Sequence, residues 1–143
     1  MTIIQNCELC QFAASTVHAN EKFSVILVDD AFYPGFCRVI WRDHVREMSD
    51  LEAHDRQLLN EAVYQVELAV REVMAPTKIN VASLGNVVPH LHWHVIPRYT
   101  DDAHFPAPVW AEAARVPDAA VLEARRARLP QLADAIARRM NQG

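Results

Sequence analysis

The stretch His90-Leu91-His92-Trp93-His94-Val95-Ile96 places a histidine at every second position of a short apolar run. Successive side chains of an extended strand point to opposite faces, so we expect the three imidazoles on one face and the apolar side chains on the other. Buried ring nitrogens need hydrogen-bond partners, which makes such a row unusual in a purely structural core. The stretch therefore predicts both a strand and a candidate site of chemistry.

Two further strands are predicted before the histidine run, and a third immediately precedes it. Residues 23–28 are apolar and rich in β-branched side chains, Tyr33-Pro34-Gly35 predicts a turn after them, and residues 36–41 predict a second strand. Residues 78–83 have a similar composition. We expect these segments to pair with the histidine strand in one sheet.

A long amphipathic helix is predicted between residues 49 and 76. Ser49-Asp50-Leu51-Glu52 has the S-x-x-E pattern of a capping box, and Pro76 ends the helical pattern. Between them apolar residues recur at steps of three and four, as on one face of a helix. The predicted buried positions are Leu59, Ala62, Val63, Val66, Ala69, Val70 and Val73.

The carboxy-terminal part predicts a loop followed by helices. Residues 101–108 contain two prolines and predict an irregular loop, and residues 118–129 and 130–140 predict helices, with Pro130 in a first helical turn. A sheet with one long helix on one face indicates the α+β class. We expect residues 1–117 to form the functional domain and residues 118–143 a helical extension of the same domain.

Composition favours an ordinary globular enzyme or binding protein. The chain has 143 residues, 51% of them hydrophobic and 22% charged, with a formal net charge of −4. This charge argues against nucleic-acid binding through phosphate neutralisation. No apolar run is long enough to span a bilayer, and the first residues lack the pattern of a signal peptide. We expect a cytoplasmic protein whose three cysteines form no disulfide framework.

The histidine row supports three interpretations. One imidazole is a nucleophile that attacks phosphorus while another handles protons, a two-step cleavage that needs no metal. Alternatively the row binds a catalytic zinc ion, although no acidic residue lies between Gly85 and Tyr99 to complete such a site. The third interpretation is structural packing.

Residues 85–98 resemble the signature of the histidine triad (HIT) family, in which three histidines alternate with apolar residues. The segment Val39-Ile40-Trp41-Arg42-Asp43-His44-Val45 is similar to the strand that precedes the family's long helix. The resemblance covers about residues 7–110. It implies an α+β fold with an antiparallel sheet, a homodimer, and hydrolases or transferases that act on the α-phosphate of nucleotides, most often adenosine nucleotides.

The resemblance also implies roles for individual residues. His92 is the expected nucleophile, and His94 is expected to contact the phosphate and to aid proton transfer. Asn80 and Asn86 match phosphate-contacting positions, while Val87 stands where many members carry Ser or Thr, so a hydroxyl donor is missing.

Two further positions are expected to contact the nucleoside. Asp29 resembles an acid that binds the ribose hydroxyls. Trp110 is a candidate for stacking on the base, with closure of the core as the alternative.

Cys7-Glu8-Leu9-Cys10 is a C-x-x-C motif, which on its own indicates either a redox pair or a metal site. A zinc site needs further ligands, for which His44 and His90 are candidates. Zinc-bearing HIT proteins are similar in using these four positions, which implies a structural zinc held by Cys7, Cys10, His44 and His90. Cys37 is expected to be a small buried residue.

Together these observations predict an enzyme that cleaves a nucleotide at its α-phosphate through a covalent nucleotidyl-His92 intermediate, with no metal required for the chemistry. A dinucleoside polyphosphate and a nucleoside phosphoramidate are both candidate substrates. The alternatives are a zinc-dependent hydrolase with the triad as metal ligands and a nucleotide-binding module without catalysis.

Overall fold

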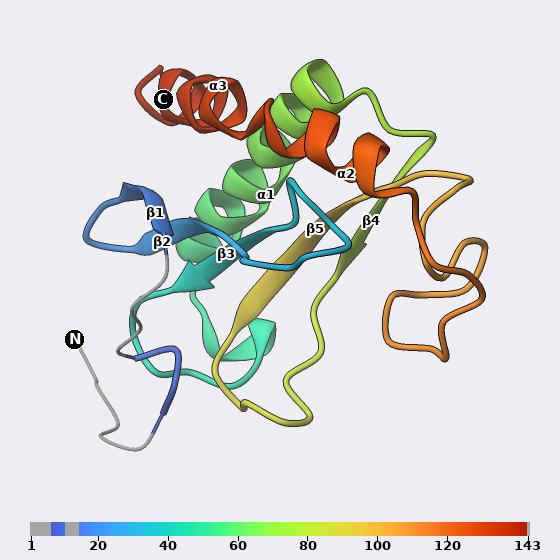
Figure 1. Ribbon diagram of the computed structural model, residues 1–143. Helices are drawn as coiled ribbons and strands as arrows, with labels where there is room; N and C mark the ends of the chain where they lie inside the picture. Colours follow the sequence, from blue (N-terminus) through green and yellow to red (C-terminus); the bar gives the residue numbers. More distant parts are fainter. Residues whose placement is uncertain (1–6, 11–14, 143) are drawn as a thin grey trace.

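Five antiparallel strands form one sheet in the order β1-β2-β3-β5-β4 (Figure 1). The computed structural model describes residues 7–10 and 15–142, and residues 1–6, 11–14 and 143 lie outside it. The predicted α+β class is confirmed. The strands are β1 (Ser15–Ala19), β2 (Phe23–Leu27), β3 (Cys37–Trp41), β4 (Lys78–Ala82) and β5 (His92–Arg98).

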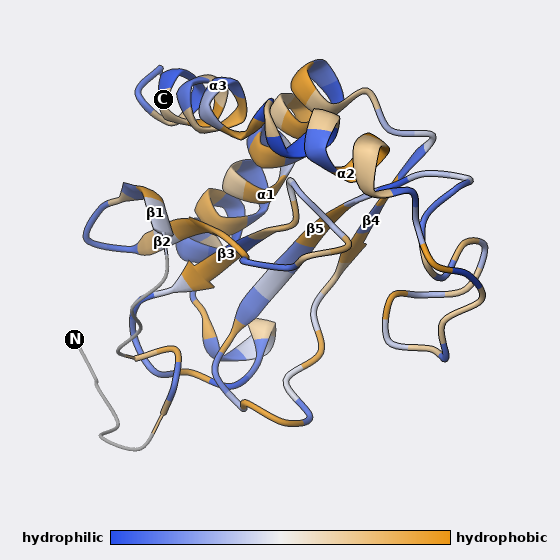
Figure 2. Cartoon of the chain, viewed as in Figure 1, coloured by the Kyte–Doolittle hydropathy of each residue, from blue (hydrophilic) through white to orange (hydrophobic). Residues whose placement is uncertain are grey.

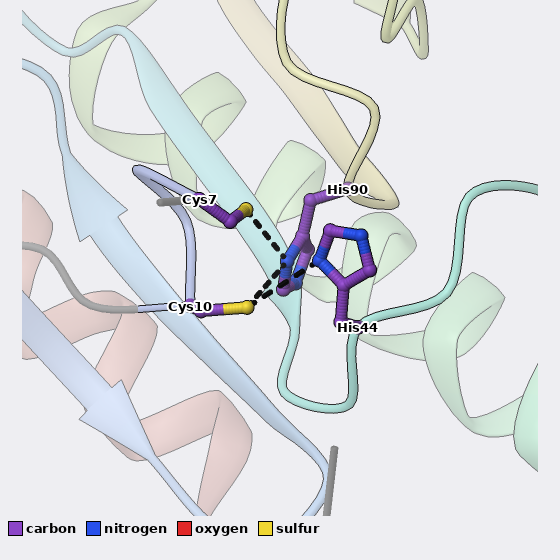
Figure 3. Close-up of side chains that lie close together, drawn as sticks. All are labelled: Cys7, Cys10, His44 and His90. Atoms are coloured by element: carbon purple, nitrogen blue, oxygen red, sulfur yellow. Dashed lines mark hydrogen bonds between the residues drawn. The ribbon is translucent and has the colours of Figure 1, made fainter. Parts of the chain in front are cut away.

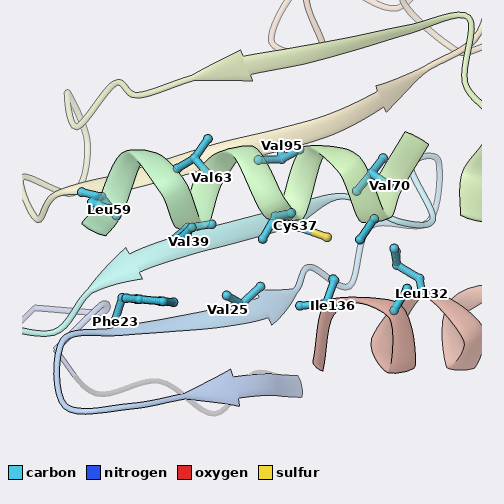
Figure 4. Packing of buried hydrophobic residues seen from close by; sticks show 14 of the residues in the cluster. Phe23, Val25, Cys37, Val39, Leu59, Val63, Val70, Val95, Leu132 and Ile136 are labelled. Carbon is cyan, nitrogen blue, oxygen red and sulfur yellow. The ribbon is translucent and has the colours of Figure 1, made fainter. Parts of the chain in front are cut away.

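Helix α1 (Ala53–Met74) covers one face of the sheet and forms the main core with it (Figure 4). Val25, Val39 and Val95 point from three adjacent strands toward this helix and are fully buried. All seven helix positions that the periodicity predicts to be buried are buried, and Met74 joins them. Cys37 is also fully buried in this cluster, as its type predicted.

The chain ends in helices α2 (Ala119–Arg126) and α3 (Leu129–Met140), which lie close to the predicted ranges. The Asp118 carboxylate accepts a hydrogen bond from the Ala120 N–H at 2.8 Å and so caps α2, and Pro130 lies in the first turn of α3. Leu132, Ala135 and Ile136 enter the same buried cluster as α1. In Figure 2 the mixed blue and orange colouring of α1 and α3 shows this amphipathic character. No described helix has the length and apolar character needed to cross a membrane.

The predicted capping box is wrong. Helix α1 begins at Ala53, and its N-cap is Glu52, whose side chain makes no capping hydrogen bond. Ser49 lies instead in a short 3-10 helix, Met48–Asp50. There the Asp50 carboxylate accepts from the Glu47 N–H at 3.0 Å. The cap was assigned one turn too early because the 3-10 turn has its own acidic cap, which a four-residue motif does not reveal.

Strand β1 was not predicted from the sequence. It is a five-residue edge strand with largely exposed side chains, and a bulge interrupts its register between Thr16 and His18. The bulge removes the clean alternation of apolar and polar residues by which a half-buried strand is recognised. Edge strands are commonly short and bulged, because a regular edge would expose unpaired backbone groups to other chains.

The predicted histidine strand is displaced by two residues. Strand β5 begins at His92, while His90 lies in a bend before it and Leu91 connects the two. The Leu91 N–H donates to the Val45 carbonyl at 2.8 Å, and the Leu91 carbonyl accepts from the Trp41 N–H at 3.1 Å. Leu91 therefore joins the segment beyond β3, and His90 is free to adopt an orientation different from that of His92.

A buried ion pair holds the loop that follows β5. Asp102 and Arg98 are 1% and 2% exposed, and they form paired hydrogen bonds of 2.8 and 3.1 Å. The Asp102 carboxylate also accepts from three loop N–H groups, those of Tyr99, His104 and Phe105. These bonds lower the pKa of Asp102 well below its usual range despite its burial. The loop therefore folds around one carboxylate.

We predict that Asp102→Ala destabilises the protein by about 3–5 kcal/mol, because it leaves the Arg98 charge buried without a counter-charge. Chemical denaturation measures this loss, with Asp101→Ala as the control. Asp101 pairs with Arg125 but is 55% exposed, so its loss is expected to cost at most about 1 kcal/mol. Equal losses in the two variants would contradict the prediction.

Candidate active site and metal cluster

The second face of the sheet carries the histidines. Register pairs Arg38 of β3 with His94 and Ile40 with His92, so these four side chains lie on the face opposite α1. The predicted shared face is thus confirmed for His92 and His94. Their rings lie edge to face with centroids 4.9 Å apart.

Two small apolar clusters cover parts of this face, and a cavity of about 390 Å³ opens beside the first of them. One cluster contains Leu9, Ile26 and Ile40, and the other contains Tyr33, Phe36 and Ile96. The cavity has the size of a small-molecule site. Its lining comprises Glu8, Leu9, Arg38, Leu84, Gly85, Asn86, Val87, Val88, His92, His94 and Trp110.

His92 is held in one orientation by its own strand. Its Nδ1 donates to the His90 carbonyl oxygen at 2.5 Å, which leaves Nε2 as the unprotonated nitrogen of the neutral ring. The Ser83 hydroxyl donates to the His92 carbonyl at 2.6 Å and fixes the backbone at the same point. Burial lowers the pKa of His92, and the nearby Arg38 charge lowers it further against the opposing hydrogen bond. A lone pair for attack on an electrophile is therefore available.

His94 is packed among aromatic rings. The Phe36 and Trp110 rings meet it edge-on with centroid distances of 5.6 and 5.1 Å. Burial lowers the pKa of His94 to about 4, with smaller contributions from His92 and Arg38, so the ring is neutral near pH 7. Its Nδ1 is buried and has no hydrogen-bond partner among the described residues.

The loop between β4 and β5 and the loop after β5 complete the cavity. Asn86 and Val87 line one side, and the Val87 side chain is 91% exposed. Trp110 is 51% exposed beside His94, so it forms part of the cavity wall and does not close the core. An exposed indole edge in such a wall can receive a planar ring by stacking.

Two of the predicted site residues lie outside the cavity lining. Asn80 is on the histidine face of β4, but its side-chain oxygen accepts from Arg98 at 2.7 Å. Asp29 is exposed after the end of β2. The structure therefore brings together His92, His94, Asn86, Val87 and Trp110 but not these two.

Cys7, Cys10, His44 and His90 form a compact cluster, with all four potential ligand atoms within 4.8 Å of one another (Figure 3). The Nδ1 of His90 lies 3.4 Å from Cys7 Sγ and 3.5 Å from Cys10 Sγ, and the Nδ1 of His44 lies 3.4 Å from Cys10 Sγ. Among the described residues, no other group of three or more such side chains could hold a metal ion. This geometry disfavours one metal ion bound by all three triad histidines, because the Nδ1 of His90 faces the two cysteines.

Sequence reasoning missed several of the other cavity residues, above all Arg38. A charged residue at the third position of Phe36-Cys37-Arg38-Val39-Ile40-Trp41 was a visible signal, because alternation places it opposite Cys37 and Val39. Arg38 shares a face with the histidines because β3 pairs with β5. The sequence alone does not reveal this pairing. Glu8 and Leu9 could not be placed without the fold of the Cys7–Cys10 turn.

Comparison with known proteins gives a consistent result. The family model described as the HIT domain matches residues 11–101. A histidine triad protein from Marinobacter aquaeolei VT8 has a similar structure, with a TM-score of 0.68 and 30% identity over 87% of this chain and 91% of that one. A histidine triad protein from Bradyrhizobium japonicum gives a TM-score of 0.67 and 30% identity over 82% and 89%.

A more distant structure shares the fold. A zinc-bound histidine triad family protein from Mycobacterium smegmatis has a TM-score of 0.60 and 22% identity, covering 91% of this chain and 97% of that one.

The hydrogen bond to the His90 carbonyl predicts the tautomer of His92. Nitrogen-15 NMR near neutral pH is expected to show a protonated Nδ1 and an unprotonated Nε2. The exposed His54 on α1 is the internal control, and averaging between its tautomers is expected. A proton on Nε2 of His92 would contradict the assignment and remove the available lone pair.

Proposed function

The chain belongs to the HIT family, and from this we propose that it is a nucleotide hydrolase or transferase that uses His92 as a nucleophile on the α-phosphate. One observation carries the proposal: His92 donates from Nδ1 to a carbonyl of its own strand while its side chain lines the cavity. That arrangement prepares Nε2 for attack before any ligand binds.

The proposed reaction has two displacements. In the first, the Nε2 lone pair forms a bond to the α-phosphorus, and the bond to the leaving group breaks with its electron pair on the leaving atom. The Nδ1–H bond to the His90 carbonyl stabilises the charge that develops on the ring. In the second, a water oxygen attacks phosphorus, the N–P bond breaks, and Nε2 recovers its electron pair. The neutral His94 ring beside it can accept the proton that water releases.

The cavity walls fit a nucleotide. Asn86 offers an amide for the phosphate, and the half-exposed Trp110 indole offers a surface for the base, with adenine favoured by the family resemblance. Arg98 holds the side-chain oxygen of Asn80, so a phosphate contact by Asn80 would come from its amide N–H groups and requires the ligand to extend beyond the cavity lining. A ribose contact by Asp29 requires the ligand to extend beyond the cavity.

We also propose that the protein forms a homodimer and is located in the cytoplasm. Strand β4 lies at the edge of the sheet, and its Val81 is 38% exposed. An edge strand offers unpaired backbone groups to a second copy of the chain.

We predict that His92→Ala lowers turnover of an adenine nucleotide substrate by about 10³-fold or more, as expected for loss of a nucleophile. Labelled nucleotide is incubated with the protein, the reaction is quenched in alkali, and phosphorus attached to histidine is sought. Wild type and the exposed-site control His54→Gln are expected to be labelled, and His92→Ala is not.

Turnover retained in His92→Ala would remove His92 from its role. Nucleotide binding by the wild type without any labelling would instead identify a binding module.

We also propose that the cysteine and histidine cluster holds a structural zinc ion. The donors fit the metal, because tetrahedral zinc with bonds of about 2.3 Å to sulfur and about 2.0–2.1 Å to nitrogen places bound S and N atoms about 3.5 Å apart. Three of the four S-to-N distances in the cluster are 3.4, 3.4 and 3.5 Å, and all the donor atoms lie within 4.8 Å of one another. His90 Nε2–H donates to the Trp41 carbonyl, which leaves Nδ1 unprotonated toward the cysteines. The ion would join residues 7–10 to the bend before β5 and to the segment after β3, and it would take no part in the chemistry.

We predict about one zinc ion per purified chain by elemental analysis, as expected for a complete Cys₂His₂ ligand set. Cys10→Ser is expected to lower the zinc content well below one and to lower the melting temperature, whereas Cys37→Ala, a change in the core, retains the metal. Chelation is expected to loosen the fold before it affects the chemistry. Wild-type protein without zinc and with freely reactive Cys7 and Cys10 would refute the site.

A further inference from the structure

Arg38 is the one permanently cationic side chain among the described residues that line the cavity. It stands on β3 directly opposite His94, and its guanidinium carbon lies 5.9 Å from the centre of the Phe36 ring. Its charge contributes to the lowered pKa of both His92 and His94. A positive charge is thus held beside the proposed nucleophile.

This charge has unused bonding capacity. The Arg38 Nε is buried and has no hydrogen-bond partner among the described residues. None of the ion pairs found between described residues involves Arg38. The nearest acidic influence is Glu8, whose side chain is exposed at the rim of the same cavity. An unpaired guanidinium edge in a cavity is suited to an anionic group such as phosphate.

The cavity is better suited to a leaving group that departs as a stable anion than to a strongly basic leaving group that must be protonated as it departs. Val87 contributes only an apolar side chain to the cavity wall, and the neutral His94 ring is a poor source of a proton. A leaving amine or alkoxide needs a proton as its bond breaks, whereas a leaving phosphate departs as a stable anion. Preorganised positive charge stabilises such an anion directly.

We propose that Arg38 binds the departing phosphate of the substrate and so selects nucleoside polyphosphates over substrates that leave as an amine or alcohol. The inference rests on the proposed function, in which His92 attacks the α-phosphorus. The N–P bond forms as the anhydride P–O bond breaks, and its electron pair moves onto the bridging oxygen of the departing phosphate. The guanidinium N–H groups donate to that phosphate, and no proton is transferred to it.

The first test compares two substrates in matched variants. Diadenosine tetraphosphate and an adenosine 5′-phosphoramidate are given to wild type, Arg38→Gln, Arg38→Lys and the exposed α3 control Arg138→Gln. In Arg38→Gln the ratio of kcat/KM for the polyphosphate over the phosphoramidate is expected to fall about 100-fold, the scale of losing one charge-stabilising donor. Arg38→Lys retains a cation and is expected to lose less of this ratio, and Arg138→Gln none. An unchanged ratio in Arg38→Gln, including an equal loss for both substrates, overturns the proposal.

A second measurement separates this proposal from the function on which it rests. Binding of inorganic tripolyphosphate is measured by calorimetry with the same variants and with His92→Ala, so that no turnover is needed. Binding is expected to weaken at least tenfold in Arg38→Gln and to persist in His92→Ala. Equal binding by wild type and Arg38→Gln overturns the role of Arg38 even if His92 is labelled. Failure of His92 labelling, with the Arg38-dependent binding intact, overturns the proposed function and the leaving-group role but identifies Arg38 as an anion-binding residue.

Discussion

His90 is the residue on which the geometry of the site depends, because three of its polar atoms make contacts in three directions. Its Nδ1 faces the two cysteines, its Nε2–H donates to the Trp41 carbonyl, and its carbonyl oxygen accepts from His92 Nδ1. The ring is fully buried. A shift of His90 would therefore disturb the cluster of residues 7–10, the junction with β3 and the orientation of the His92 ring together.

A second constraint acts at the other end of β5. The buried Arg98 and Asp102 pair fixes the turn after the strand, and Arg98 also donates to the Ala107 carbonyl at 2.7 Å, close to Trp110. Breaking a buried charge pair is costly, so this loop has few alternative conformations. Trp110 is thereby kept against His94 at one wall of the cavity, while the Cys7–Cys10 turn supplies Glu8 and Leu9 at another.

The fold class, α1, four of the five strands and both terminal helices were predictable from the sequence: α1 from its apolar periodicity, strands such as β2 from their β-branched composition, and the start of α3 from Pro130. Edge strand β1 was missed because its bulge breaks the alternation, and the turn at Met48–Asp50 displaced the helix cap. The sequence also suggested one row of three histidines. Tertiary hydrogen bonds override it, because Leu91 pairs with Val45 and Trp41 and leaves His90 in a bend. The site was predictable where one segment supplies it, as with His92 and His94, and not where Arg38 enters through strand pairing.

The two faces of the sheet explain how one short strand can serve both stability and chemistry. Val95 packs under α1 and is fully buried, while its neighbour His94 lines the cavity on the opposite face. Because the α1 face carries the main core, the opposite face can tolerate the cost of a partly buried arginine and of an unpaired imidazole nitrogen. Those unpaired groups lie side by side at Arg38 and His94, where a phosphate could satisfy both. Two of the three buried polar atoms that lack a partner among the described residues, Arg38 Nε and His94 Nδ1, therefore belong to the face where the proposed anionic ligand would bind.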